Sequence, residues 1–527
     1  MEKRTLLALA LSFLILFLFQ YFYVKQQPIQ KQYPVQKAQQ EKDKEGQEKK
    51  LELAIPAQKP QTAIGRDIHI ETDLYKVILT TKGATIKYFE LKKYKDDKGH
   101  NIVLLKEQGS KPPLGIGKSK EIEFSDANFN VDKESLILNK DLNNGSIVFE
   151  YADGVTSIRR TLIFSNNTYK IELKDEIMGL PEYWITLGSN FGIFNEKEQV
   201  HTGPVILKEA NRMEFNKNKL TDIKTYKDDL KWIAQEDKYF FSSLVPLSVV
   251  EEAVVWKYKD DVLVAFKSKN SINNFVLYAG PKEYDTLKAL NLHLEHIIDF
   301  GFFSIVAVPL FWVLKFFYKI LGNYGWAIIV LTLIIRIPFI PLINKSQKSM
   351  KKMQEIQPRM AEIREKYKKD PKRMQQELME LYKKHKVNPV GGCLPILLQI
   401  PIFFALYKIL LIAIELRGAP FLLWIKDLSA PDTLFGHIPS WFPIIGGFAV
   451  GPLPLLMGAS MVIQQKMTPT SLDPTQNRLM MIMPIIFTFL FLNFASGLVL
   501  YWLMNNVFSI IQQFYVNKKL EREKQEG

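Results

Sequence analysis

Hydrophobic residues are gathered in blocks along the chain, and the first block lies at its start. Residues 5–24 are uncharged, and these 20 residues would form a helix that crosses the roughly 30 Å hydrocarbon layer of a membrane. A cleaved secretory signal is the alternative, but the block is long, ends in Tyr21, Phe22 and Tyr23, and has no small-residue cleavage site after it. We therefore predict an uncleaved anchor over 1–24, with its basic N-terminal end in the cytoplasm.

A polar segment follows this block. Residues 25–60 are rich in Lys, Gln, Glu and Pro, and they have too little apolar surface to offset the entropy that is lost on ordering. Such a segment is more often a solvated tether than a binding site. We therefore predict a flexible periplasmic linker.

An alternation typical of β-strands begins after the linker and continues to about residue 290. β-branched and aromatic residues recur in short runs, separated by turn signals such as Asn143-Asn144-Gly145 and Asp153-Gly154. This pattern, with hardly any helical period, predicts an all-β sandwich domain over 61–290. Because the domain follows an anchor whose other end is cytoplasmic, we expect it in the periplasm. The expected strands cover 75–80, 84–88, 146–150, 157–164, 169–173, 253–258 and 275–278.

Apolar blocks of membrane-spanning length return in the C-terminal part of the chain. One transmembrane helix is expected over 322–343 and four more within 393–516. Before them, 301–314 is apolar for only 14 residues. Blocks of that length usually lie in the interface rather than span, so we predict an interfacial amphipathic helix over 291–321. The candidate spans are 323–343, 393–414, 441–463, 479–494 and 497–516.

Charge sets the expected orientation of these spans. The chain carries 69 Lys and Arg against 55 Asp and Glu, a net charge of +14, which suits either a nucleic acid or a membrane surface. The loop 344–392 holds 14 basic and 6 acidic residues, whereas 417–440 holds two basic residues. By the positive-inside rule, the basic loop and the tail, 517–527, lie in the cytoplasm. This arrangement requires six spans with both termini inside.

The basic loop is expected to fold as a cytoplasmic helical hairpin over 344–392. Apolar residues repeat at 3-4-3-4 spacing in its first half, and Asp370-Pro371 is a typical N-cap and first position of a second helix. Two interpretations are open: a solvated hairpin packed on itself, or a flexible Met-rich surface that meets other chains or the membrane. The seam residues are Met353, Ile356, Met360, Ile363 and Tyr367, then Met374, Leu378 and Leu381.

A charged residue lies in the middle of the second predicted span. An Arg at the centre of a bilayer costs about 2.5–3.5 kcal/mol on insertion scales, and no Asp or Glu in the spans is placed to neutralise Arg336. Two compatible interpretations are a hydrated cavity open to one side, and a tether that joins helices through carbonyls and hydroxyls. Its polar neighbours are expected to be Thr332 one turn before it, Gln399, and the stripe Tyr501, Asn505, Asn506, Ser509, Gln512 and Gln513.

Catalytic and metal-binding patterns are scarce. The single Cys excludes an intramolecular disulfide framework and a cysteine-cluster metal site. No nucleophile elbow and no phosphate-binding glycine loop is found. His293 and His296 have a metal-like spacing, but a third ligand is not evident, so a face of an interfacial helix is favoured over a metal site. We therefore expect no catalytic residues, no metal, no cofactor and no use of ATP, and a protein that is not an enzyme.

A set of short motifs together resembles the YidC membrane protein insertases of bacteria, in the Gram-negative form with a large periplasmic domain. The resemblance covers essentially the whole chain, and the combination of motifs is highly specific. The motifs are Tyr278-Ala-Gly-Pro281, Gly322-Asn-Tyr-Gly-Trp326, Val387-Asn-Pro-Val-Gly-Gly-Cys-Leu-Pro395, Gln399-Ile-Pro-Ile-Phe403, Glu415-Leu-Arg417, Trp424-Ile-Lys-Asp-Leu428, Gln465-Lys-Met-Thr-Pro469 and Ser496-Gly-Leu-Val-Leu-Tyr501.

The resemblance implies a fold, a location and an activity. It implies a five-helix insertase core beside the N-terminal anchor, and a β-supersandwich periplasmic domain, in the bacterial inner membrane. It implies insertion and folding of membrane proteins, alone or with the Sec translocon, through a water-filled groove that is open to the cytoplasm and to lipid. The implied partners are nascent membrane proteins, the Sec translocon, the ribosome and membrane lipids, without recognition of nucleic-acid sequence.

The resemblance also implies which residues line the groove. Arg336 would supply its positive charge, and the hairpin 344–392 would recruit substrate. Ile400 and Phe403 match positions along which substrate helices slide. Tyr501 matches the first member of a tyrosine pair, whereas the second position is Trp502 in this chain. The expected groove residues are Arg336, Thr332, Gln399, Ile400, Phe403, Tyr501, Trp502 and Asn505.

Two other classes of protein are less consistent with these patterns. A secondary transporter should contain paired, broken helices in repeated halves and a site for a coupling ion. The spans here have unequal loops and a lone basic charge. Assignment as a sugar-modifying enzyme would be based on the sandwich architecture alone, and a fold does not determine a function.

Overall fold

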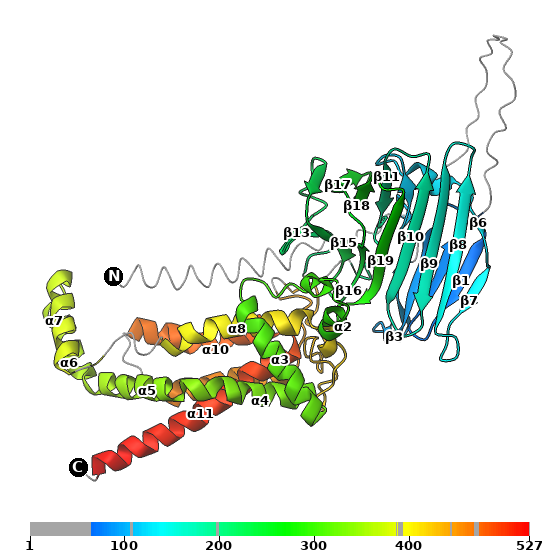
Figure 1. Ribbon diagram of the computed structural model, residues 1–527. Coiled ribbons are helices and arrows are strands. Elements are labelled where there is room, and N and C mark those ends of the chain that lie inside the picture. The colour runs from blue at the N-terminus through cyan, green and yellow to red at the C-terminus, as the bar shows by residue number, and fades with distance from the viewer. Residues whose placement is uncertain are drawn as a thin grey trace, which may run out of the picture. The chain divides into compact units, whose positions relative to one another are not determined.

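The computed structural model describes residues 65–105, 109–195, 200–385, 387, 394–442, 445–467 and 474–525 (Figure 1). The predicted anchor, 1–24, and the predicted linker, 25–60, lie outside the described residues. The chain divides into two compact units, Met1–Ile297 and Ile298–Gly527. The first is rich in strands and the second is helical, in agreement with the predicted order of a β domain and a membrane-helix region.

The strands of the first unit form three sheets, and apart from the parallel pair β1·β7 all paired neighbours are antiparallel. The first sheet has the order β4 (Asn101–Leu105), β3 (Thr85–Lys95), β2 (Tyr75–Thr80), β1 (Asp67–Glu71), β7 (Ser135–Ile137). The second has the order β13 (Asn211–Glu214), β12 (Gly203–Lys208), β15 (Leu230–Glu236), β16 (Phe240–Pro246), β19 (Ile272–Pro281), β10 (Lys170–Met178), β9 (Ser157–Ser165), β8 (Asn144–Ala152), β6 (Asn130–Val131). The third has the order β14 (Lys224–Lys227), β17 (Glu252–Tyr258), β18 (Asp261–Ser268), β11 (Tyr183–Thr186), β5 (Ile116–Gly117).

Each of the predicted strands is found, and most extend a few residues further than expected. The run 75–80 is β2, and 157–164 lies within β9. Burial alternates along β9, with Ile158, Leu162 and Phe164 buried, because successive side chains of a strand point to opposite faces. The prediction of a β sandwich is therefore confirmed. Short helical turns complete the unit: η1 (Glu123–Asp126), α2 (Tyr284–Ala289) and η2 (Leu294–Ile297).

A buried ion pair lies inside this β unit. Arg160 on β9 faces Asp175 on β10, and both side chains are fully buried. The guanidinium donates from Nε to Asp175 Oδ1 over 2.8 Å and from Nη2 to Oδ2 over 2.7 Å. Its remaining nitrogen donates to the carbonyl oxygens of Ala84 and Leu114, over 2.9 and 2.6 Å. Arg160 therefore joins its own sheet to two loops that belong to other sheets.

The second unit consists of helices. A glycine with a positive φ of 66°, Gly322, ends α3, and the side chain of Asn323 caps the start of α4 by accepting from two backbone N–H groups. The helices are α3 (Ser304–Leu321), α4 (Tyr324–Arg336), η3 (Ile337–Phe339), α5 (Ile340–Glu355), α6 (Gln357–Lys366), α7 (Pro371–Lys384), α8 (Leu394–Ile412), η5 (Ile414–Leu416), α9 (Pro452–Met467), α10 (Pro474–Phe491) and α11 (Ser496–Gln525).

Two of the described helices are long and apolar enough to cross a membrane, Ser304–Leu321 and the continuous run Tyr324–Glu355. The predicted number of six spans is therefore not confirmed. Helix α3 is 18 residues long, which is enough to span a membrane, so the length of the 14-residue apolar run does not distinguish an interfacial helix from a spanning one. Its assignment to the interface stays a prediction. The run that includes α4 and α5 also passes the predicted boundary at residue 343 without a break in the helix.

The predicted span 441–463 is wrong in its first half. Helix α9 begins only at Pro452, and the described residues before it form turns and a short paired segment. Phe435 N donates to the carbonyl of Val450, and Ile438 N donates to that of Phe448. Glycine and proline explain the difference, because this apolar stretch contains three glycines and ends in a proline, which interrupt a helix whatever its hydrophobicity.

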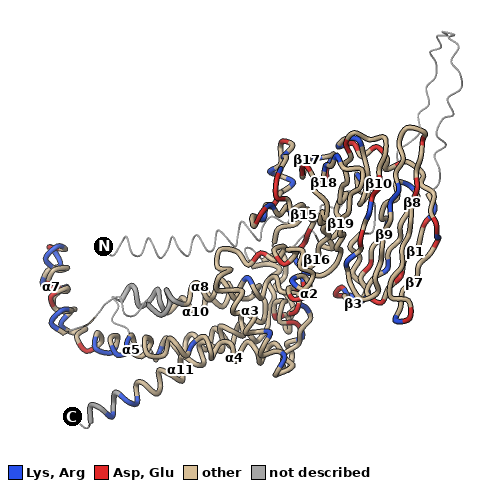
Figure 2. The backbone as a smooth tube through the Cα atoms, in the orientation of Figure 1, with Lys and Arg blue, Asp and Glu red and all other residues tan. Residues whose placement is uncertain are grey.

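The predicted hairpin is present as α6 and α7. Asp370 caps α7 as expected, since its Oδ1 accepts from Arg373 N over 3.1 Å. The seam packs on itself, and charged residues recur along α7, whereas α4 is nearly uncharged until its last residue (Figure 2). Its buried core is Met353, Ile356, Met360, Leu381 and Val387, with Ile363, Leu378 and Tyr382 packed against it.

Candidate functional site

Arg336 is the last residue of α4, and its side chain is 8% exposed. Its guanidinium reaches α11, where Nη1 donates to the backbone carbonyl of Asn505 over 2.8 Å and to Asn505 Oδ1 over 3.0 Å. Nε and Nη2 both donate to Gln512 Oε1, over 3.3 and 2.9 Å. Asn505 and Gln512 are seven residues apart on one helix, so they lie two turns apart on the same face. The guanidinium therefore bridges two turns of α11.

The amide group of Gln512 extends this network to a third helix. Its Nε2 donates to Asn344 Oδ1 over 2.8 Å and makes a longer contact of 3.4 Å with the carbonyl of Ile340, both on α5. No Asp or Glu among the described residues forms an ion pair with Arg336. The charge is therefore satisfied by neutral oxygens, which agrees with the predicted tether between helices. The predicted hydrated cavity around Arg336 stays a prediction.

Thr332 does not take part in this network. It lies one turn before Arg336 and is buried, as expected, but its hydroxyl donates to the carbonyl of Ile328 in its own helix over 2.7 Å. Such a bond to the preceding turn is a common way for a hydroxyl in an apolar helix to be satisfied. The sequence shows that Thr332 and Arg336 share one face of the helix, but it does not show that the hydroxyl bonds to Ile328 instead of to Arg336.

A second polar contact joins α8 to α11. Gln399 Nε2 donates to the hydroxyl of Tyr501, which is almost fully buried. One turn further along α8, the ring of Phe403 meets the ring of Trp502 edge to face, with centroids 5.3 Å apart. Ile400, between them, is 41% exposed. The structure thus brings together four predicted groove residues, and Trp502 belongs to an aromatic cluster.

The aromatic cluster shows the role of Trp502, which stands where the tyrosine pair of the family would have its second member. Its ring also lies 5.1 Å from the ring of Phe491 and 5.7 Å from that of Phe487, both on α10. Aromatic pairs at such distances favour offset or edge-to-face packing and add to the stabilisation that comes from burial. Trp502 therefore holds α8, α10 and α11 together through its apolar ring.

Two further polar residues of the predicted stripe bind α9, whereas the hydroxyl of Ser509 donates to the carbonyl of Asn505 in its own helix over 2.8 Å. Asn506 Nδ2 donates to Ser460 Oγ over 2.9 Å, and Gln513 Nε2 donates to the carbonyl of Met467 over 2.6 Å. Ser460 was missed by the sequence analysis, as was Asn344. A single Ser or Asn near the end of an apolar run does not stand out in the sequence. Its role in joining two helices is recognised only from its hydrogen-bond partner on the other helix.

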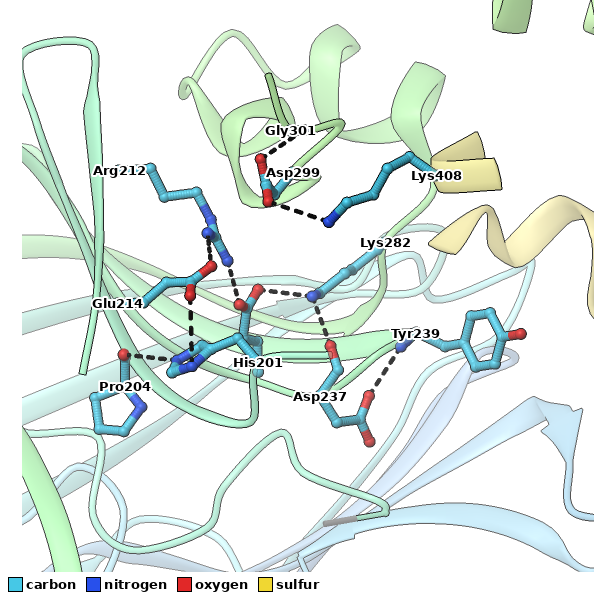
Figure 3. Close-up of polar contacts among 11 residues, drawn as sticks. His201, Pro204, Arg212, Glu214, Asp237, Tyr239, Lys282, Asp299, Gly301 and Lys408 are labelled. Carbon is cyan, nitrogen blue, oxygen red and sulfur yellow. Dashed lines mark hydrogen bonds and ion pairs between the residues drawn. The ribbon is translucent and has the colours of Figure 1, made fainter. Parts of the chain in front are cut away.

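The helical unit also contains ion pairs away from Arg336. Lys315 on α3 lies 3.6 Å from Glu415 in η5, and both side chains are largely buried. Lys408 Nζ lies 3.6 Å from Asp299 Oδ2, while Asp299 Oδ1 accepts from Gly301 N over 2.8 Å (Figure 3). Glu415 and Lys408 therefore each lie opposite a side chain of the opposite charge.

The β unit contains a buried polar network that the sequence did not reveal. Lys282 Nζ donates to Glu236 Oε2 and to the carbonyl of Asp237, each over 2.6 Å, and Arg212 pairs with Glu236 and with Glu214 (Figure 3). Burial raises the pKa of the Asp237 carboxyl, whose oxygens accept from the backbone N–H groups of two nearby segments, Phe194-Asn195 and Tyr239-Phe240. The charges of Lys282, Arg212, Glu214 and Glu236 therefore satisfy one another inside the unit.

Comparison with known proteins decides the family. Residues 67–313 match the family model described as the YidC periplasmic domain, and residues 316–524 match the model described as 60Kd inner membrane protein. This chain belongs to the YidC family. A YidC-family membrane protein insertase of Syntrophus aciditrophicus is 38% identical over 566 residues, which cover 98% of this chain and 100% of that protein.

A second relative supports the same assignment to the YidC family. The membrane protein insertase YidC of Geotalea daltonii is 38% identical, over 99% of this chain and 100% of that protein. Among solved structures, an active YidC insertase with its first transmembrane domain resolved matches with 20% identity and a TM-score of 0.38, over 85% of this chain and 92% of that one. The assignment rests on the sequence matches, which extend over both units.

Proposed function

We propose that this chain is a membrane protein insertase and chaperone of the bacterial inner membrane, with its β domain in the periplasm. The observation that supports this most is the position of Arg336, a buried cation in an apolar helical unit whose hydrogen-bond partners are neutral. A charge in such a place is costly, so it calls for a function. Curated members of the family over nearly the whole length are named membrane protein insertases.

The proposed mechanism uses Arg336 as the positive charge of a hydrated groove open to the cytoplasm. Translocating a short hydrophilic tail costs mainly desolvation, so a groove that carries water part of the way shortens the dry path. Arg336 attracts acidic residues of the incoming tail by a Coulomb interaction that is stronger than in bulk water. Its neutral partners leave its charge uncancelled, which favours this role.

The apolar helix of the substrate is proposed to leave sideways into lipid along α8. Ile400 and Phe404 lie one turn apart on this helix and are 41% and 37% exposed, whereas Phe403, the other predicted sliding position, packs against Trp502. They present an apolar strip beside the buried contact between Gln399 and Tyr501. Burial of the substrate helix in lipid then drives release, so the protein needs no ATP, no cofactor and no enzymatic step.

The hairpin and the remaining partners belong to the same proposal. The hairpin α6–α7 is proposed to meet substrates in the cytoplasm before insertion through its exposed, basic surface, because its Met-rich seam is buried in its own core. We propose nascent membrane proteins, the Sec translocon, the ribosome and lipids as partners. Six spans with both termini in the cytoplasm complete the proposed topology.

Reconstitution tests this function. The purified chain in lipid vesicles should insert a single-span substrate with a short acidic tail, measured by protection of that tail from added protease. A matched substrate with Asn in place of each Asp serves as the electrostatic control. Empty vesicles give the spontaneous rate, and insertion no faster than that rate, for every substrate tried, would refute the proposal.

A further inference from the structure

The end of the β unit carries a cluster of metal-binding side chains. We propose that His293, Glu295 and His296 form a binding site for a divalent cation of the zinc class. One donor atom from each of the three lies within 4.8 Å of the others. From the sequence alone only the two histidines stood out, and the lack of a third ligand spoke against a metal. The fold supplies that ligand.

Local backbone geometry explains why the two histidines converge. Residues 294–297 form a single 3₁₀ turn, η2, and His296 N donates to the carbonyl of His293 over 3.3 Å. A 3₁₀ helix has three residues per turn, so side chains at positions i and i+3 stand one above the other. On the longer helix that the sequence suggested, the same two side chains would also share a face but would be offset around the helix axis. The short turn therefore directs both imidazoles to one side.

The backbone at His293 is strained and is held in place. Its φ is +58°, a conformation that non-glycine residues rarely adopt. The buried Trp232 on β15 donates from Nε1 to the carbonyl of His293 over 2.9 Å, which fixes the turn to the sheet. Strain that is maintained by the surrounding structure gathers at ligand clamps and other functional sites. A rigid element of this kind preorganises the ligands for a metal.

Glu295 provides an independent indication. Its Oε2 is buried and has no hydrogen-bond partner among the described residues. A buried carboxylate oxygen without a partner is costly and calls for an explanation such as a bound ion. A cation held by the two histidines would satisfy it.

The donor set selects the metal. Two imidazole nitrogens and one carboxylate oxygen suit Zn²⁺, whereas Ca²⁺ and Mg²⁺ prefer oxygen ligands throughout. Zinc ligands lie about 2.0–2.2 Å from the metal, which places tetrahedral donors roughly 3.4 Å apart. Small side-chain rotations would bring the three donor atoms, which lie within 4.8 Å of one another, to that distance. The fourth position is left for water, and the bound ion would brace the segment where the β unit ends at Ile297.

Metal binding by the full-length protein tests the site. The chain is purified in detergent without a histidine tag, stripped with a chelator and titrated with Zn²⁺ against a chromophoric competitor. Co²⁺ is used in parallel, because its visible absorption reports tetrahedral coordination. One ion per chain is expected, with a rise in the melting temperature on saturation, because a ligand that binds only the folded state stabilises it.

Variants distinguish a built site from incidental binding. His293→Asn tolerates the positive φ, His296→Gln is conservative in size, and Glu295→Gln keeps the shape and removes the charge. Loss of a residue that only hydrogen-bonds to a metal ligand lowers metal affinity roughly 10–100-fold. Each of these variants removes a ligand itself, so each should weaken Zn²⁺ binding by more than that. His100→Gln is the matched control, because His100 also lies near a carboxylate, 3.4 Å from Asp96, but outside the cluster; this variant should bind normally.

Two results would overturn the site. The first is wild-type affinity in all three ligand variants, which would mean an adventitious ion only. The second is a wild-type protein that shows no saturable binding and no tetrahedral Co²⁺ spectrum. Far-UV circular dichroism of each variant confirms that the strands are intact, and the binding measurement does not depend on insertion activity.

Discussion

Replacing Arg336 by Lys keeps the positive charge and removes the planar fork of donors. In the structure this fork reaches three acceptors, the carbonyl and side-chain oxygens of Asn505 and the side-chain oxygen of Gln512. An ammonium group can retain the contacts to Asn505 but not the paired contact to Gln512. Polar contacts between membrane helices are worth roughly 0.6–1.7 kcal/mol each. Arg336→Lys should therefore lower stability by about 1 kcal/mol, and Arg336→Ala by about 2–4 kcal/mol.

The effect on insertion follows from charge instead. Two unit charges 6 Å apart, at an effective dielectric constant of about 40, attract by about 1.4 kcal/mol, which is a factor of ten in rate. Arg336→Ala should therefore slow insertion of a substrate with an acidic tail about tenfold and that of a neutral one less than about twofold. Arg336→Lys should stay within about threefold of the wild type for both.

The assay combines protease protection in vesicles with the melting temperature of each variant in detergent. Gln512→Leu is the matched control, because it removes the same contact from the other side and leaves the Arg in place. It should lower the melting temperature as much as Arg336→Lys does and preserve the preference for acidic tails. If Lys and Ala lose insertion equally for acidic and neutral tails, in step with stability, the electrostatic reasoning is refuted and Arg336 is only a tether.

Further expectations concern the hairpin, the topology and the β core. Replacing 357–384 by a Gly-Ser linker should impair insertion while the other helices still assemble on native gels; normal insertion would reduce the hairpin to packing. In a cysteine-free background, an impermeant thiol reagent added outside should label Lys426→Cys and spare Lys368→Cys, and the reverse pattern would contradict six spans. Arg160→Met should destabilise the β unit to urea by roughly 3–5 kcal/mol, because it leaves a buried carboxylate unpaired. Arg159→Met, on the exposed face of the same strand, should change stability by less than about 0.5 kcal/mol.

Features that depend on neighbours in the chain could be predicted from the sequence. The strand at Tyr75–Thr80 follows from alternating residues between turn signals, and the cap of α7 follows from Asp370 before Pro371. The seam Met353, Ile356 and Met360 follows from helical spacing. The family, too, is carried by short motifs in the chain. Each of these signals arises within a few residues, where backbone sterics and side-chain period act directly.

Apolar composition alone predicted helix boundaries wrongly where glycine and proline favour turns. The start of α9 was expected at 441 and lies at Pro452. Hydrophobicity reports the tendency to enter a membrane, but glycine and proline decide whether the backbone can continue as a helix. The helix predicted over 291–321 was too long at its start, since α3 begins only at Ser304, and the charged Lys315 and Lys319 lie within it without interrupting it.

Only the tertiary structure decided which polar groups meet. Arg336 was recognised from its cost, but its partners Asn505 and Gln512 lie 169 and 176 residues away. The sequence places Glu295 between His293 and His296, but the bond from Trp232 that holds this turn to the sheet comes from a residue 61 positions away. Hydrogen bonds and metal ligands require particular distances and directions, and these are set by how elements pack rather than by local period. The pattern of residues thus determined the strands, the hairpin and the family, whereas packing decided the contacts through which a buried charge is satisfied.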